Sequence, residues 1–342
     1  MSLEFDSLQD IAEAMTIKGK GILAADESNP TCTKRFDSIG VESTEQNRNL
    51  YRDMLFTTEG MKEFISGVIL YDETIRQSTI NDGVPIPDFL SGLGVIPGIK
   101  VDAGAKDLAG MDGEKVTEGL DGLDRRLKEY YSLGARFAKW RAVISIGEAE
   151  PSGTCISANA HALARYASLC QQNGIVPIVE PEILMDGVHT IEDSFIVSEE
   201  VLQTVFYELY NHNVLLEGIV LKPNMVLSGY DCSEKASVEK VADMTIKVFK
   251  RCVPSAVPGI AFLSGGQSDE DATAHLNAMN KSLGDKSPWN LTFSYGRALQ
   301  APALKVWGGK NENISNAQQA FYKRARLNSL ATMGNYSEDM ES

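Results

Sequence analysis

Basic residues are scarce in this chain of 342 residues, and the shortage excludes two classes of partner. Against 47 acidic residues stand 32 lysines and arginines, so the net charge is −15 and the isoelectric point lies near 4.8. A field of this sign repels nucleic acid and anionic membrane surfaces, and we expect neither as a partner. A ligand that carries phosphate must therefore meet a local basic pocket.

Histidine and closely spaced cysteine are scarce too, which argues against a metal centre. The four histidines include no short-spaced pair: His161, His189, His212 and His275. The five cysteines are odd in number and widely separated: Cys32, Cys155, Cys170, Cys232 and Cys252. A zinc ribbon or a disulfide framework is not indicated by such spacing. The sequence also lacks a Walker loop and a G-x-G-x-x-G motif, so we expect no metal and no nucleotide cofactor.

Long apolar runs are missing as well. No stretch approaches the roughly 18 residues that a membrane span needs, and residues 1–10 show no basic segment before an apolar core. We expect a cytoplasmic protein. The composition, 43% hydrophobic and 23% charged, is that of a globular protein with a sizeable core. Because no linker divides the chain, we predict a single domain over residues 1–342, in which residues 335–342 form a mobile acidic tail.

Eight short apolar runs predict strands, and helix-patterned segments separate most of them. The runs are Gly21–Ala25, Gly67–Tyr71, Val95–Val101, Ala135–Ala138, Ile175–Val179, Gly218–Leu221, Gly259–Leu263 and Leu291–Ser294. Eight such units favour an α/β fold, the closed (β/α)8 TIM barrel. An extra N-terminal helix is predicted at Ser7–Met15, and a C-terminal helix at Asn316–Leu330 precedes the tail.

Most connections between these runs carry helical periodicity. Helices are predicted at Glu114–Leu133, Ala158–Gln172, Ser198–Asn211, Lys235–Arg251 and Asp269–Asn280. Candidate N-caps are serines that open a capping box or precede helix-forming sequence: Ser43, Ser315, Ser157, Ser233 and Ser268. The connection Thr74–Gly94 is rich in glycine and proline, so a long loop is predicted there.

Polar residues stand at the end of seven of the eight predicted strands. They are Asp26, Lys100, Lys139, Glu180, Glu182, Lys222, Ser264 and Arg297. The carboxyl ends of the strands form the active site of a barrel enzyme. Polar strand ends can simply be solvated, but so many opposite charges at one rim favour an active site.

Lys222 is the candidate nucleophile. It follows the apolar run at residues 215–221 and precedes Pro223, which ends the strand. Burial lowers the pKa of a lysine, and a neutral amine attacks carbonyl carbon, so we predict that Lys222 forms a Schiff base. The alternative is a strand-end lysine that extends its amine into water.

Three neighbours complete the predicted chemistry. Lys139, on a nearby strand, favours loss of a proton from Lys222 through repulsion between like charges. Glu180, on the strand between them, is suited to proton transfer while a carbinolamine forms and dehydrates. Asp26, across the ring of strands, is predicted to take a proton from a substrate hydroxyl, unless it only caps the turn that follows it.

Two clusters predict phosphate sites on either side of this amine. The first combines glycines, a helix start near Ser268 and an arginine: Ser264, Gly265, Gly266, Ser294, Gly296 and Arg297. The second combines hydroxyls and basic side chains: Ser28, Thr31, Lys34, Arg35 and Lys100. Two phosphates with a carbonyl between them describe a ketose bisphosphate.

These residues lie in segments that resemble class I fructose-bisphosphate aldolase, the Schiff-base type, and the similarity extends from Gly19 to about Tyr336. The segments are GILAADES at 21–28, FAKWR at 137–141, VEPE at 179–182, LKPNM at 221–225, FLSGGQS at 262–268 and FSYGRALQ at 293–300. The resemblance implies reversible cleavage of fructose 1,6-bisphosphate to dihydroxyacetone phosphate and glyceraldehyde 3-phosphate. It also implies a homotetramer that serves glycolysis, gluconeogenesis or carbon fixation.

The resemblance assigns roles to the residues as well. It implies that Lys222 forms the imine, that Glu180 is its acid/base partner and that Asp26 acts on the hydroxyl at the cleaved bond. Glu182 and Lys139 are then supporting charges. One phosphate would bind at Ser264, Gly265, Gly266, Ser294, Gly296 and Arg297, and the other at Ser28, Thr31, Arg35 and Lys100.

The chain departs from the animal members of the family at two places. They usually have serine where this chain has Thr31, and they end in a tyrosine that reaches into the site. Here Tyr336 stands a few residues before the end, so a water held by Glu180 or a flexible Tyr336 is expected to supply the proton. Two alternatives stay open: an aldolase that prefers sedoheptulose 1,7-bisphosphate, and a barrel that serves as a scaffold. The intact charged set disfavours the scaffold.

Overall fold

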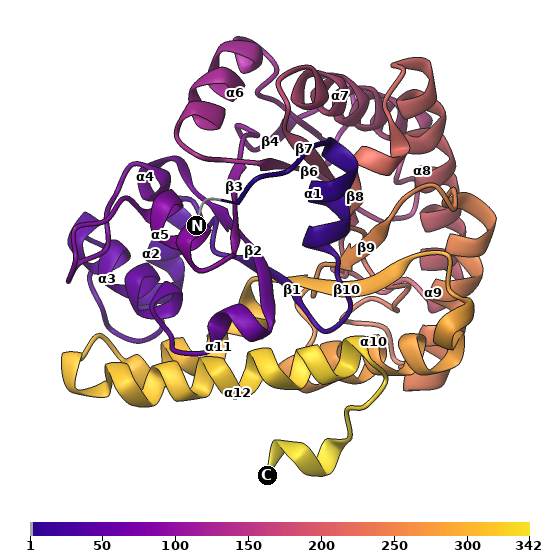
Figure 1. The fold of residues 1–342 in the computed structure, drawn as a ribbon. Helices are drawn as coiled ribbons and strands as arrows, with labels where there is room; N and C mark the ends of the chain where they lie inside the picture. Colours follow the sequence, from indigo (N-terminus) through magenta and orange to yellow (C-terminus); the bar gives the residue numbers. More distant parts are fainter. Residues whose placement is uncertain (1–2) are drawn as a thin grey trace.

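A computed structural model describes residues 3–342 and confirms the predicted TIM barrel (Figure 1). Eight parallel strands close in the order β1-β10-β9-β8-β7-β6-β3-β2. They are β1 (Gly21–Ala24), β2 (Ile65–Leu70), β3 (Ile96–Lys100), β6 (Phe137–Ile144), β7 (Val176–Ile183), β8 (Val220–Leu221), β9 (Gly259–Phe262) and β10 (Asn290–Tyr295). The remaining pair, β4 (Ala105–Asp107) and β5 (Lys115–Thr117), forms an antiparallel hairpin outside the barrel.

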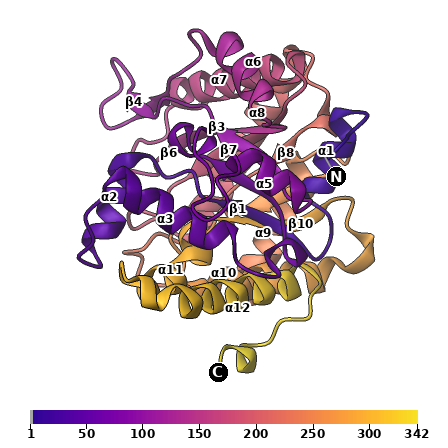
Figure 2. The ribbon, with the colours of Figure 1, turned by 60° about the vertical axis from the view of Figure 1, so that its left-hand side comes forward.

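Helices surround the strands, as the rotated view in Figure 2 shows. They are α1 (Leu8–Met15), α2 (Asn29–Asp37), α3 (Glu45–Phe56), α4 (Asp72–Ile75), α5 (Ile86–Gly92), α6 (Leu123–Ser132), α7 (Gly153–Gln172), α8 (Ile191–Asn211), α9 (Val238–Cys252), α10 (Asp269–Leu283), α11 (Arg297–Trp307) and α12 (Ile314–Thr332). Short 3-10 turns occupy Met61–Glu63, Leu216–Gly218, Gly284–Lys286, Asn311–Asn313 and Glu338–Glu341. Among residues 3–342, no helix has the length and apolar character that a membrane crossing requires.

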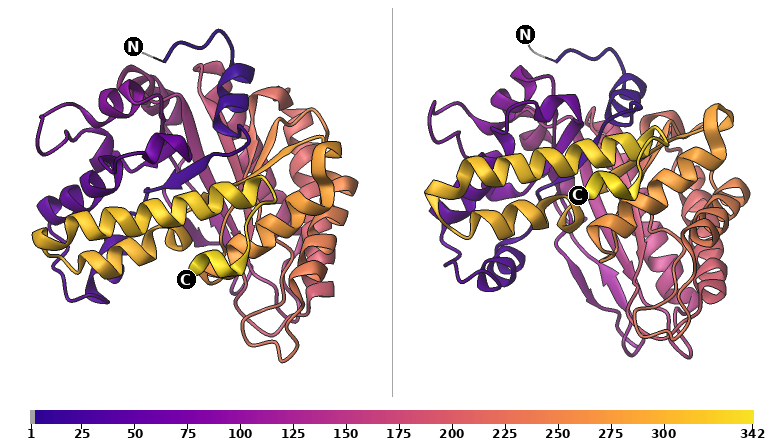
Figure 3. Two further views of the ribbon diagram at one scale, coloured as in Figure 1. Left: turned by 60° about the horizontal axis from the view of Figure 1, so that its bottom comes forward. Right: turned by 90° about the horizontal axis from the view of Figure 1, so that it is seen from below.

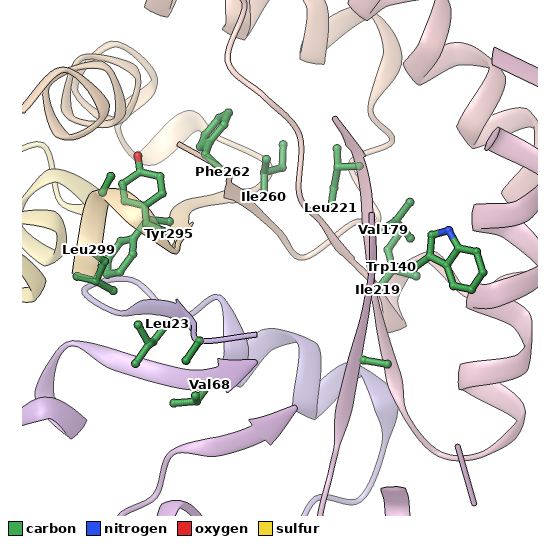
Figure 4. Close-up of a cluster of buried hydrophobic side chains, with 14 of the residues drawn as sticks. Leu23, Val68, Trp140, Val179, Ile219, Leu221, Ile260, Phe262, Tyr295 and Leu299 are labelled. Carbon is green, nitrogen blue, oxygen red and sulfur yellow. The ribbon is translucent and has the colours of Figure 1, made fainter. Parts of the chain in front are cut away.

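Two apolar layers hold the barrel together. Inside it, the Phe137 ring fills space that glycine leaves free, because a Cβ at Gly98 would lie 2.2 Å from that ring. Helix α1 packs on this interior cluster, and the Ser66 hydroxyl donates to the Met15 carbonyl (2.6 Å), so α1 covers the amino end of the barrel. Outside the strands, a second layer fills the space beneath the helices, with Trp140 among its largest side chains (Figure 4).

The fourth and fifth barrel strands are longer than predicted. We ended them at Ala138 and Val179, before the first charged residue, whereas β6 and β7 pair over eight residues each. Lys139, Glu180 and Glu182 therefore lie within strands and not after them. Charged side chains fit inside these strands because, toward the carboxyl ends of the strands, the barrel is lined by side chains of opposite charge instead of apolar ones.

The prediction of one helix over Glu114–Leu133 is wrong. Its first part is strand β5, and only Leu123–Ser132 is helical. Gly119 (φ 125°) and Gly122 (φ 67°) adopt conformations that a helix does not contain, so the chain turns twice before α6 begins. The glycine-rich connection Thr74–Gly94, predicted as a long loop, holds the last two residues of α4 and the whole of helix α5, so the loop prediction is wrong over residues 86–92.

Several predicted caps lie a few residues from the observed ones. Ser268 does cap α10, because its side chain accepts from the Asp271 backbone N–H. The side chains that cap the other helices belong to neighbours of the predicted serines: Thr44 for α3, Ser152 for α7 and Ser237 for α9. Helix α12 begins at Ile314 without a side-chain cap, so the capping box at Ser315 is wrong.

The C-terminal segment has specific contacts in the structure. Tyr336 is 5% exposed, and its hydroxyl donates to Glu341 Oε1 (2.8 Å). Arg324 on α12 forms an ion pair with the same carboxylate (2.8 Å). Figure 3 shows this segment beside α10 and α12, and Tyr336 does not line the central cleft. The mobility of residues 335–342 stays a prediction.

Candidate active site

A cleft of about 1040 Å³ opens at the carboxyl ends of the barrel strands. Every residue predicted for the site lines it, although the set comes from seven different strands and the loops that follow them. Its walls carry seven basic side chains: Lys34, Arg35, Lys100, Lys139, Arg141, Lys222 and Arg297. Six acidic ones face them: Asp26, Glu27, Asp102, Glu180, Glu182 and Asp186. The cleft is thus slightly positive in a strongly negative protein, as a phosphate ligand requires.

Lys222 lies at the floor of this cleft and is 4% exposed. Its backbone N–H donates to the Val179 carbonyl (2.8 Å), which continues the β7–β8 pairing one residue beyond the short strand β8. The amine lies 3.0 Å from Glu180 Oε1. The alternative of a solvated strand-end lysine is therefore wrong, because this side chain is buried and held by a carboxylate.

Glu180 separates the two lysines. Lys139 Nζ lies 3.4 Å from Glu180 Oε2, whereas Lys222 approaches the other oxygen of the same carboxylate. We expected direct repulsion between the two ammonium groups, and the structure instead places one buried negative charge between them. Such a position lets Glu180 exchange protons with the amine that it contacts.

Lys139 also reaches across the cleft to Asp26 Oδ2 (2.8 Å). Burial alone would raise the pKa of the Asp26 carboxyl, but Lys139 and then Lys222 outweigh burial and hold that pKa at about 2. Burial would likewise lower the pKa of Lys139, whereas Asp26, Glu180 and Asp102 together raise it well above its ordinary value. Asp26 is consequently a carboxylate and Lys139 an ammonium ion at neutral pH.

Asp26 does not cap the helix that follows it. The N-cap of α2 is Ser28, and this helix has no side-chain cap hydrogen bond among the described residues. The carboxylate of Asp26 faces the cleft, opposite the strands that carry Lys139 and Lys222. This placement supports a role in chemistry over the capping alternative.

Asp102 is a site residue that the sequence reasoning missed. Its carboxylate contacts Lys100 Nζ (2.5 Å) and lies 4.0 Å from Lys139 Nζ. Arg141 was missed as well, and it forms an ion pair with Glu182 at the same rim. Asp102 stands two residues beyond Lys100, just after β3, and Arg141 stands two residues beyond Lys139 within β6. Every second side chain of a strand points to the same face, so this spacing would have indicated that both residues face the site.

The first predicted phosphate cluster has the backbone geometry of an anion site. Gly265 (φ 58°) and Gly266 (φ 85°) adopt left-handed conformations, and helices α10 and α11 begin directly after the two loops. Arg297 opens α11, and Ser294 Oγ is buried and has no hydrogen-bond partner among residues 3–342. A ligand oxygen at this place would satisfy that hydroxyl.

Tyr230 is a further cleft residue without a sequence signal. It lies in the long connection after β8, and its hydroxyl donates to the Gly265 carbonyl (2.7 Å). A Cβ at Gly266 would lie 1.7 Å from that hydroxyl and 3.0 Å from Arg297. Glycine is therefore required at position 266, and Tyr230 fixes the loop against which a phosphate would bind.

The second predicted cluster lies on the side of β1 and β3. The hydroxyls of Ser28 and Thr31 are 3.1 Å apart at the start of α2. Arg35 forms an ion pair with buried Glu27, which the Gln300 amide also contacts (2.9 Å). The basic groups are thus held in place before any anion arrives.

Metal ligands do not gather in the cleft. Its carboxylates Asp26, Asp102, Glu180 and Glu182 each contact a lysine or an arginine. A cation placed among them would face ammonium and guanidinium groups. Within residues 3–342, the one group of three histidine or acidic side chains spaced for a metal lies on outer helices, at His161, Glu208 and His212.

Fold and cleft together define a (β/α)8-barrel enzyme with a buried lysine between two clusters suited to anions. Comparison with known proteins is consistent with this class. The family model described as "Glycolytic: Fructose-bisphosphate aldolase class-I" matches residues 7–342. This chain belongs to the class I fructose-bisphosphate aldolase family.

Individual relatives share nearly the whole chain. A probable fructose-bisphosphate aldolase class 1 of Xanthomonas campestris is 57% identical over 335 residues, which cover 98% of this chain and 99% of that protein. The cytoplasmic isozyme of Spinacia oleracea is 55% identical, with 97% of this chain and 92% of the relative covered. A solved structure of Plasmodium falciparum fructose-bisphosphate aldolase, in complex with TRAP and a small-molecule inhibitor, superimposes with a TM-score of 0.95 at 51% identity, and 98% of each chain is covered.

Proposed function

We propose that this protein reversibly cleaves fructose 1,6-bisphosphate to dihydroxyacetone phosphate and glyceraldehyde 3-phosphate through an imine on Lys222. One observation carries the proposal. The buried Lys222 amine lies 3.0 Å from Glu180, and Lys139 contacts the other oxygen of that carboxylate (3.4 Å). Two anion-suited clusters flank this arrangement, as a substrate with phosphates at both ends requires.

The first half of the reaction joins substrate and enzyme. The Lys222 amine attacks the ketone carbon, and Glu180 transfers protons while the carbinolamine loses water. Lys139 remains an ammonium ion and stabilises the negative charge of Glu180 and Asp26 throughout. The product is a protonated imine that draws electrons from the neighbouring carbon–carbon bond.

Cleavage follows at that bond. Asp26, ionised at neutral pH, accepts the proton of the hydroxyl on the departing carbon as that hydroxyl becomes the aldehyde of glyceraldehyde 3-phosphate. The electron pair of the broken bond passes into the imine and forms an enamine. Protonation of the enamine carbon and addition of water then release dihydroxyacetone phosphate and restore the lysine. Glu180 is our candidate for that proton, because Tyr336 is held at α10 through Asn277 and, through Glu341, at Arg324 of α12.

Chelation tests the absence of a metal step. We expect full activity after prolonged treatment with EDTA and gel filtration, because the cleft carboxylates are occupied by lysines and arginines. Loss of activity that zinc or another divalent ion restores would contradict the imine mechanism.

Arg297 tests the position of the first phosphate. Its replacement by alanine should weaken the binding of dihydroxyacetone phosphate by about 1.5–3 kcal/mol, the range for a lost hydrogen bond to a charged group. Titration calorimetry measures this effect. Lys305→Ala is the matched control, because Lys305 is an exposed cation at the far end of the same helix. Equal affinities of the two variants would show that the phosphate binds elsewhere.

The relatives support proposals on three properties: the oligomeric state of the protein, its location in the cell and the number of carbon atoms in its substrate. The family resemblance supports a homotetramer, and two Arabidopsis thaliana relatives at 56% identity bear the word cytosolic in their names, which supports a cytoplasmic protein. The relatives are named for fructose bisphosphate, which favours the six-carbon substrate over the seven-carbon one. Relative cleavage rates of the two bisphosphates test this preference.

A further inference from the structure

A cluster on the outer surface of the barrel carries chemistry that the aldolase reaction does not use. It consists of His161 on α7 with Glu208 and His212 at the end of α8, and we call it the outer histidine cluster. One ligand atom from each residue lies within 4.8 Å of the others. We propose that the outer histidine cluster binds a divalent transition-metal ion, with Zn²⁺ as the probe of choice.

The distances fit a three-ligand site. His161 Nδ1 lies 3.0 Å from Glu208 Oε2, and the centroids of the His161 and His212 rings are 5.0 Å apart. Ligand atoms around tetrahedral zinc stand about 3.3 Å apart, given bonds of about 2.0–2.1 Å. The side chains are partly exposed, with 53% for His161, 21% for Glu208 and 24% for His212, so small rotations complete the approach.

The histidine that ends α8 is already oriented in the way that metal ligands are. The Nδ1 of His212 bonds to the backbone carbonyl of Glu208 (2.9 Å), so Nε2 of the neutral ring keeps a free lone pair. A hydrogen bond from one ring nitrogen to a carbonyl is the usual support for a metal-binding histidine. The i,i+4 spacing of Glu208 and His212 places both on one face of α8.

The charge of Glu208 favours a cation at this place. Among residues 3–342, no lysine or arginine forms an ion pair with Glu208, and its contacts are the two histidines. The net charge of −15 further attracts cations to the surface. Two imidazoles and one carboxylate are a donor set that zinc accepts, with one position open to water.

The site is separate from the reaction. Helix α8 follows β7 and begins at the cleft side, and Glu208 lies 17 residues further on, about 25 Å along the helix axis. A bound ion would instead connect α7 to α8 and stabilise the folded chain, because the unfolded chain does not assemble the three ligands.

Zinc titration of the full, untagged, metal-free chain tests the proposal. We expect saturable binding of one Zn²⁺ per chain by calorimetry and a melting temperature that rises with zinc. His161→Ala, Glu208→Gln and His212→Ala should each weaken the binding at least tenfold. Glu200→Gln removes the same charge from an exposed position of the same helix and should leave the affinity unchanged.

Two further measurements keep the outcome unambiguous. The variants should retain wild-type aldolase activity. Retained activity shows that they fold, and it makes the test of the metal site independent of the test of the aldolase function. A chain with Cys232→Ser and Cys252→Ser should bind zinc as the wild type does, since these are the least buried thiols. Absence of saturable binding, equal affinity of Glu208→Gln and Glu200→Gln, or loss of binding in the chain with Cys232→Ser and Cys252→Ser would overturn the proposal.

Discussion

Borohydride added together with dihydroxyacetone phosphate should inactivate this protein irreversibly and leave a triose phosphate adduct on the peptide that contains Lys222. The reason is the difference between its two buried lysines. Lys139 contacts Asp26 and Glu180, and with Asp102 these carboxylates raise the pKa of Lys139 despite its burial, so Lys139 stays an ammonium ion. Within residues 3–342, the Lys222 amine forms an ion pair with Glu180 alone, and this carboxylate can accept its proton. Peptide mapping by mass spectrometry measures the outcome.

The variant Lys222→Arg supplies the control. Arginine keeps the positive charge beside Glu180 but does not form an imine under these conditions, because its guanidinium remains protonated. We expect no turnover and no adduct, while the affinity for phosphate stays close to that of the wild type. An adduct on Lys139 or on Lys100 would show that the nucleophile has been assigned to the wrong strand.

The sequence predicted which side chains meet in the cleft, because barrel topology converts chain order into position. Residues at the ends of parallel strands converge whatever their separation along the chain, so finding the eight runs was enough to bring Asp26, Lys139 and Lys222 together. What the runs did not reveal was the pairing among the charges. Glu180 lies between two lysines, and Lys139 lies between two carboxylates. These contacts depend on side-chain length and strand register, which cannot be read from the linear sequence.

The errors have a common physical origin. Strand limits were set at the first charge, yet Lys139 and Glu180 lie inside β6 and β7, because a polar cleft permits charges where an apolar core does not. Helix limits were set by apolar periodicity, which continued through Gly119 although its left-handed conformation breaks the helix. Tyr230 had no signal at all, since a long connection brings it to Gly265 only in three dimensions.

Asp26→Asn should lower kcat for cleavage by about 10²–10⁴-fold, the usual contribution of a positioned general base. Imine formation should survive, because Lys222 and Glu180 keep their contact (3.0 Å), and the borohydride adduct should still form with dihydroxyacetone phosphate. Asp102→Asn is the matched control. Asp102 also lies near Lys139 (4.0 Å) but contacts Lys100, so its loss should raise KM more than it lowers kcat.

The pH dependence tests the ionised state of Asp26, and the Lys222 adduct separates a base from a merely structural charge. Since Lys139 and Lys222 hold the pKa of Asp26 at about 2, below its usual value, the carboxylate is ionised throughout the neutral range and does not lose its charge until the pH falls toward that value. The rate constants for cleavage by the wild type and by Asp26→Asn, measured in single turnovers by stopped flow, should therefore keep a constant ratio between about pH 6 and pH 9. A ratio that changes across this range would contradict the ionised state of Asp26. A variant that loses the Lys222 adduct along with cleavage would mean that Asp26 acts by holding Lys139 in place and does not accept the substrate's proton.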